Sequence, residues 1–184
     1  MVASTIELMI KKEDFSKLEN VCKLGSKSNK RNQMKIRYML EESVPLDVLR
    51  NLNLDPEEKQ KLVFNGTVIS KIVKNCSDLT SLFEQLKIED YQDLRPQRCM
   101  EHLVTNEDSA QKLIDKVNEL KDSRMATNSF ILLVNQELDS SALQLYKDFE
   151  NSLDSEIINH KSNKETKTKM ENLVKKHGLN IAVT

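Results

Sequence analysis

A chain of 184 residues is long enough to bury a core of its own, and 38% hydrophobic with 31% charged residues is the composition of a folded protein. The 28 Lys and Arg residues nearly balance the 29 Asp and Glu residues, and a net charge of -1 argues against a protein dedicated to nucleic acid or to an anionic membrane. Three glycines and three prolines are too few for a β-sandwich or a glycine-built phosphate site. The composition therefore predicts an all-α fold.

The sequence of the first part of the chain predicts two or three helices. Apolar residues recur at helical spacing over residues 4–24, interrupted by a polar break, which predicts two short helices or one kinked helix. Ser4 and Glu7 have the spacing of a capping box at its start, and Gly25 stands where a left-handed residue would end it. The polar residues after Gly25 predict a further helix that continues through Glu42.

The next stretch carries the clearest start signal. Pro45 predicts the first turn of a short helix, and Asp55-Pro56 followed by two glutamates predicts a helix that begins at residue 56. Asn65-Gly66 could form a hairpin turn, but its flanks are short. We therefore favour a helix end there, with Thr67 capping the next helix.

The central part predicts one short helix, two fragments and one longer helix. Asp78 caps an amphipathic helix whose apolar residues follow at offsets of three and four. Pro96 divides residues 88–104 into two short pieces. Thr105 and Asp108 have the spacing of a capping box before the next amphipathic helix.

The last part predicts three more helices. The run Phe130 to Val134 is uniformly apolar and predicts a nearly enclosed, central helix. Asp139 caps a helix that ends before a polar connector around residues 159–169. A final helix stops at His177-Gly178.

Together these elements predict about eight to ten helices of about 8 to 18 residues, arranged as an antiparallel bundle or an α-solenoid stack. Gly25 and Gly66 are 41 residues apart and Thr105 follows about one further interval on, a spacing of the HEAT or armadillo type. We expect residues 1–184 to form a single helical domain, either complete or one module of a larger protein.

Two features of the sequence bear on membrane association and cellular location. The run Phe130 to Val134 is the longest uninterrupted apolar stretch, and a membrane helix needs about 20 residues, so no membrane association is expected. Glu7 and Lys11 interrupt the first apolar stretch, which is therefore not a secretory signal. We expect an intracellular protein, cytoplasmic or nuclear.

Residues that could carry chemistry are scattered. Cys22, Cys76 and Cys99 are odd in number and widely spaced, which predicts reduced thiols. Cys99 and His102 stand one helical turn apart and could supply two zinc ligands, but a closed zinc site needs four. The sequence therefore predicts no metal site.

The remaining candidates also favour structural roles. His160 and His177 stand alone, at positions where a helix surface or a helix end accommodates a histidine. Ser109 and Lys112 have a spacing used by some acyl-transfer enzymes, but the companion motifs are absent. We expect no cofactor and no enzymatic activity.

The most asymmetric feature is a basic stretch over residues 23–37, which contains no acidic residue. Such a stretch either forms a solvated helix surface or binds phosphates or an acidic partner. Its six cationic side chains, the candidate binding residues of the chain, are Lys23, Lys27, Lys30, Arg31, Lys35 and Arg37.

These observations favour a non-catalytic protein-protein interaction module, a scaffold, adaptor or regulatory subunit that binds another protein in a groove between helices. The alternative is a nucleic-acid-binding regulator that uses the basic stretch. The sequence gives no oligomeric state and no partner identity.

Overall fold

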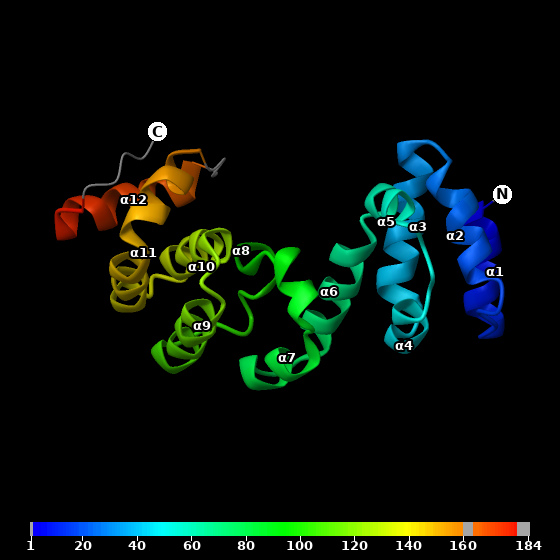
Figure 1. The fold of residues 1–184 in the computed structure, drawn as a ribbon, viewed down its shortest axis with the longest axis horizontal. Coiled ribbons are helices and arrows are strands. Elements are labelled where there is room, and N and C mark those ends of the chain that lie inside the picture. Colours follow the sequence, from blue (N-terminus) through cyan, green and yellow to red (C-terminus); the bar gives the residue numbers. More distant parts are fainter. Residues whose placement is uncertain (1, 160–163, 180–184) are drawn as a thin grey trace. The chain divides into compact units, whose positions relative to one another are not determined.

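The computed structural model describes residues 2–159 and 164–179, and every regular element in this part of the chain is a helix (Figure 1). The all-α prediction is confirmed. Twelve α-helices and one 3-10 helix are present among the described residues, more than the expected eight to ten. The number is higher because four of these α-helices are shorter than eight residues.

The chain divides by its internal contacts into two compact units, which we call unit 1 (Met1–Asn75) and unit 2 (Cys76–Thr184). The residues of each unit pack mainly against other residues of the same unit. The expectation of a single domain over residues 1–184 stays a prediction.

Unit 1 contains six helices among its described residues, 2–75. Its core is built mainly from aliphatic side chains, and Ile6, Leu18, Ile36, Leu40 and Leu62 are completely buried. α1 packs against α2 and α3, while α5 and α6 pack against each other and against α3. The helices are α1 (Val2–Lys12), α2 (Leu18–Ser26), α3 (Lys30–Ser43), α4 (Leu46–Arg50), α5 (Pro56–Leu62) and α6 (Phe64–Asn75).

The first two helices confirm the predicted break but not its boundaries. α1 already begins at Val2, so Ser4 lies inside the helix and forms no capping box with Glu7. Gly25 does not end α2 in a left-handed conformation. It lies inside the helix, where an added Cβ would come within 2.4 Å of Ile36 Cδ1, so the residue is small because α2 and α3 pack closely there.

Two helix starts in unit 1 follow the predicted capping. Asn29 accepts a hydrogen bond from the backbone N–H of Asn32 at 3.0 Å and begins α3. Asp55 and Glu58 form a reciprocal capping box at the start of α5. Each cap satisfies a backbone donor that has no partner within the helix.

The junction between α5 and α6 differs from the prediction. Val63 ends α5 in the left-handed conformation, with φ of 50°, and α6 begins at the next residue. Gly66 and Thr67 therefore lie inside α6, and the Thr67 hydroxyl donates to the Val63 carbonyl at 3.1 Å instead of capping a new helix. No hairpin forms among the described residues.

Unit 2 is organised around one buried helix. The ten residues from Met125 to Val134 in α10 are all buried, and α8, α9, α11 and α12 pack against this helix, which confirms the predicted central helix. Pro96 opens α8 and separates it from the 3-10 helix, as expected. The elements are α7 (Leu79–Gln85), the 3-10 helix η1 (Ile88–Gln92), α8 (Pro96–Cys99), α9 (Glu107–Leu120), α10 (Ser123–Asn135), α11 (Asp139–Asn159) and α12 (Lys164–His177).

Some boundaries in unit 2 correct the sequence analysis. The cap of α9 is Asn106, one residue later than predicted, because its side chain accepts from the backbone N–H of Ser109. The predicted connector 159–169 is shorter than expected, since α12 already begins at Lys164, and residues 160–163 lie outside the described residues. α12 stops at His177, before Gly178 with φ of 61°, as predicted.

The structure also removes the basis for the repeat interval. Gly25 and Gly66, which defined the interval of 41 residues, both lie inside helices and do not mark boundaries between repeats. No helix among the described residues is sufficiently long and apolar to span a membrane.

Candidate functional site

The six basic candidate residues do not form one uniform surface. Lys23 lies on α2 and pairs with Glu19 one turn earlier, with Nζ and Oε1 2.6 Å apart. Hydrogen bonding to Glu19 raises the pKa of Lys23, because the bond favours the charged amine. Arg37 is only partly exposed and lies near Glu41, whose pKa it helps to lower. These two cations already interact with acids of the same unit.

The other four cations are available to a partner. Lys27, Lys30, Arg31 and Lys35 are exposed, and none of them forms an ion pair with another residue that the structure describes. They occupy the end of α2 and the beginning of α3.

The first turn of α3 has an unfavourable charge pattern. Lys30 and Arg31 lie at the positive end of the helix dipole, and this turn contains no acidic residue. A cation there costs on the order of 0.3–1 kcal/mol, the reverse of what an acid gains. The pattern does not serve helix stability, and a bound anionic group would offset its cost.

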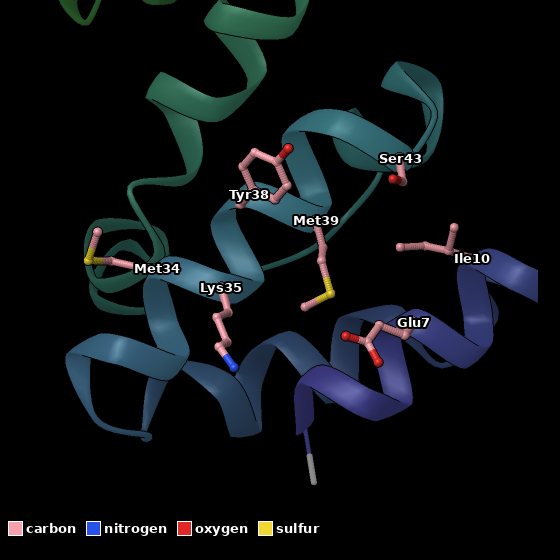
Figure 2. A pocket seen from close by; sticks show the side chains of 7 residues that line it. All are labelled: Glu7, Ile10, Met34, Lys35, Tyr38, Met39 and Ser43. Carbon is pink, nitrogen blue, oxygen red and sulfur yellow. The ribbon is translucent and has the colours of Figure 1, made fainter.

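A groove of about 580 Å³ lies beside this basic end, between α1 and α3. Figure 2 shows Met39 and Lys35 extending from α3, and Ile10 and Glu7 from α1. Seven residues line the groove: Glu7, Ile10, Met34, Lys35, Tyr38, Met39 and Ser43.

The groove exists because α3 has more apolar residues than its neighbours cover. Ile36 and Leu40 are buried in unit 1, whereas Met34 is 72% exposed and Tyr38 is 66% exposed. These two residues are four apart and therefore lie on the same side of the helix. Met39, partly buried, lies between the exposed side and the core.

The charges at the groove are arranged unequally. Lys35 lies on α3 and Glu7 on α1, both exposed, and they form no ion pair with each other. Arg31 precedes Lys35 by one turn of α3, so it lies on the same side of the helix as this lining residue, just outside the lining itself. The α1 edge carries Glu7 and, one turn later, Lys11, so its two charges are of opposite sign.

The two units also differ in charge. Unit 1 contains 14 Lys and Arg against 10 Asp and Glu, a net charge of +4, whereas unit 2 contains 14 against 19, a net charge of -5. The net charge of the whole chain is close to zero because the negative charge of unit 2 cancels the positive charge of unit 1. The groove lies within that unit.

A second cavity, of about 440 Å³, lies between α7 and α9 in unit 2. Both of its lysines already have partners within unit 2. Lys116 lies 5.6 Å from the ring centre of Phe83 and 5.9 Å from that of Tyr91, and its Nζ is 2.6 Å from Glu119 Oε2. Lys112 donates to the Thr80 hydroxyl at 3.2 Å. These contacts join α7 and α9 and leave the cavity a weaker candidate than the groove.

The zinc-ligand candidates lie in different local structures. Cys99 ends α8 and its thiol donates to the Arg95 carbonyl at 3.2 Å, while His102 lies in the turn that follows. Burial raises the pKa of the Cys99 thiol to about 11. Among the described residues, no group of three potential metal ligands comes together.

The other candidates have structural positions. His177 is exposed at the last residue of α12, and His160 lies outside the described residues. The Ser109 hydroxyl donates to the Asn106 carbonyl at 2.8 Å as part of the α9 cap, so it is not directed toward Lys112.

No protein family, curated protein or solved structure matches the chain. The features of the chain that bear on function are the groove, the exposed cations and the charge of unit 1.

Sequence reasoning missed the exposed apolar residues of the groove. The apolar residues of α3 fall at positions 34, 36, 38, 39 and 40, which is too wide a spread for one buried side of a helix. That spread indicates that α3 has apolar residues outside its buried side, without indicating which ones they are.

Proposed function

We propose that the chain is a non-catalytic protein interaction module that binds another protein in the groove between α1 and α3. The observation that carries this proposal is the exposure of Met34 and Tyr38 beside the groove. Large apolar side chains grouped on one surface favour association, because a partner removes them from water. A scaffold, adaptor or regulatory subunit would have such a surface.

The exposure of the lining favours a protein over a small molecule. Small-molecule sites usually bury most of the ligand and are preformed concave pockets. Met34 and Tyr38 line the groove but have most of their surface in solvent, so a small ligand bound there would itself stay largely exposed. A helix or loop of a partner protein can cover such an open surface.

The charged groups of the groove favour binding over catalysis. General acid-base catalysis needs a positioned acid or base whose partner holds it in place. Glu7 and Lys35 are both exposed and are the two charged residues of the lining. Their arrangement is suited to electrostatic selection of a partner rather than to proton transfer.

Selection from a library of displayed peptides tests this function. We expect peptides that bind the purified chain and lose affinity by at least about tenfold when Met34→Ser and Tyr38→Ser are combined. Leu24→Ser is the matched control, because Leu24 is 62% exposed in the same unit but does not line the groove. Circular dichroism checks that each variant is folded. If no selected peptide depends on Met34 and Tyr38, the groove is not the binding site.

Nucleic-acid binding is a second candidate, favoured by the four exposed cations Lys27, Lys30, Arg31 and Lys35. It predicts an affinity for labelled single-stranded RNA that falls steeply with salt, because each phosphate contact releases counterions. Changing Lys30, Arg31 and Lys35 to Glu should abolish binding, whereas Met34→Ser should not affect it. Absence of RNA binding at about 50 mM salt would remove this candidate.

A further inference from the structure

We infer that the α1–α3 groove selects an acidic amphipathic helix, bound with its acidic edge along α3. This inference rests on the proposed function and specifies the chemistry of the partner. Three features of unit 1 support it: the length of the groove, its apolar lining and the unequal charge of its two edges.

The length of the groove fits a short helical segment. Its lining on α3 extends from Met34 to Ser43, nine residues apart, which at a rise of 1.5 Å per residue is about 14 Å along the helix. A helix lying alongside would contact the groove through about nine or ten of its own residues. Apolar side chains at positions i, i+3, i+4 and i+7 would therefore reach the groove.

A helix fits this lining better than an extended strand. The groove is bounded by α1 and α3, whose backbone N–H and C=O groups are engaged within the helices away from their ends. A strand placed there would leave its own backbone groups unpaired against Ile10 and Met39. A helix satisfies its backbone internally and offers only side chains to the apolar lining.

The charge of the α3 edge sets the acidic character. Arg31 and Lys35 lie one turn apart on the same side of α3, and neither forms an ion pair with another described residue. Two glutamates or aspartates one turn apart on the bound helix would match them. The opposite edge, with Glu7 and Lys11, carries one charge of each sign and gives no net preference.

The charge of the whole unit acts in the same direction. The net charge of +4 on unit 1 attracts an acidic segment before contact, which raises the association rate at low salt. Lys30, in the first turn of α3 with Arg31, adds to this attraction at the basic end of the groove. An acidic group bound there would also offset the unfavourable interaction of these cations with the helix dipole.

Three designed helical peptides of about 16 residues test the inference. All three carry leucines at the same i, i+3, i+4 and i+7 positions and differ only along one edge, which carries Glu, Gln or Lys. Fluorescence anisotropy gives the dissociation constant of each labelled peptide for the full chain. We expect the Glu peptide to bind at least about tenfold more tightly than the Lys peptide at about 50 mM salt, and this ratio to shrink at about 300 mM.

Charge reversal on the protein provides the second arm. In a variant that combines Arg31→Glu and Lys35→Glu, the preference should invert, so that the Lys peptide binds more tightly. Lys17→Glu is the matched control, because Lys17 is exposed in the same unit and does not line the groove. Equal affinity of the native chain for the three peptides, or an unchanged order in the double variant, would contradict the inference.

The outcomes separate this inference from the proposed function. If all three peptides bind equally and all lose affinity when Met34 and Tyr38 become Ser, the groove binds protein segments but does not select acidic ones. If no peptide depends on Met34 and Tyr38, both proposals fail. If labelled RNA displaces the Glu peptide and binds independently of Met34, the cations belong to a nucleic-acid site and the inference is wrong.

Discussion

Gly25 of α2 and Ile36 of α3 are packed so closely that a Cβ on residue 25 would lie 2.4 Å from Ile36 Cδ1. Ile36 is completely buried, so its side chain has little room to move away. The contact involves the groove-forming helix α3 itself and leaves no room there for a larger residue on α2.

Gly25→Ala should therefore destabilise the protein. Overpacking costs about 1–3 kcal/mol, and the better helix propensity of Ala recovers at most about 1 kcal/mol of it. Ile36→Val removes the atom that clashes, so Gly25→Ala should be neutral or stabilising in that background. Urea unfolding of the two single variants and the double variant measures the coupling. Gly66→Ala is the control, because its nearest neighbour, Val63 Cγ1, is at an ordinary 3.4 Å. Purely additive effects would contradict the close packing.

Glu41 should make stability depend on acid pH. Burial acts to raise the pKa of Glu41, but hydrogen bonds from Lys74 and Ser70 outweigh it and lower the pKa below the ordinary 4.5. Stability from this shift is present above pH 4.5 and is lost as the pH falls through the lower folded-state pKa. The pKa of Lys74 is raised by the same pairing, so its contribution is lost only at alkaline pH.

Glu41→Gln should lower the free energy of unfolding by about 1 kcal/mol near neutral pH, and the difference from the native chain should shrink as the pH falls toward 3. Urea titrations at several pH values measure it. Glu57→Gln serves as the control, because Glu57 forms an exposed pair with Lys61 on one helix. A difference that stays constant with pH would show that the Glu41 carboxylate is not the cause.

Cys22 should resist thiol reagents in the folded protein. Burial, together with the charges of Glu19 and Glu58, raises the pKa of the Cys22 thiol to about 12, so little reactive thiolate is present near neutral pH. In a chain with Cys76→Ser and Cys99→Ser, reaction with a chromogenic disulfide should be slow until guanidinium chloride unfolds the protein. A native-state rate equal to the unfolded-state rate would contradict the buried position.

Ser129 should be replaceable at no cost. Its hydroxyl is buried in α10 and has no hydrogen-bond partner among the described residues. Ser129→Ala removes an unsatisfied group, so we expect a change between zero and about 1 kcal/mol in the stabilising direction. Ser141 is the contrasting position, because its buried hydroxyl donates to the Glu107 carboxylate. Ser141→Ala should cost about 1–2 kcal/mol. Thermal unfolding of both variants measures the difference.

Three helix starts were predicted correctly because a cap is a contact between residues close together in the sequence. The side chains of Asn29, Asp55 and Asp78 each accept a hydrogen bond from the backbone N–H three residues later. Short polar side chains at such positions indicate a cap in the sequence. Helix ends were harder. Val63, a β-branched residue, adopts the left-handed conformation that the sequence analysis assigned near Gly66, since the packing of α6 directly after α5 determines the turn.

The site was only partly predictable for a similar reason. The basic stretch is visible in the sequence, and the pairing of Lys23 with Glu19 follows from their spacing of four. Which side of α3 stays exposed depends on where α1 and α5 pack, so Met34 and Tyr38 could not be assigned to a surface. The charge of unit 1 becomes evident only once the boundary at Asn75 is known.

In the proposed complex, the methionines of the groove would make recognition permissive. Met34 and Met39 have unbranched, polarisable side chains that can adopt several rotamers, so the lining can adjust to anchors of different shape. A surface of this kind tolerates replacement of leucine by isoleucine or phenylalanine in the bound ligand. Several ligands could then compete for the groove. Their relative affinities would depend mainly on how well their acidic side chains pair with Arg31 and Lys35.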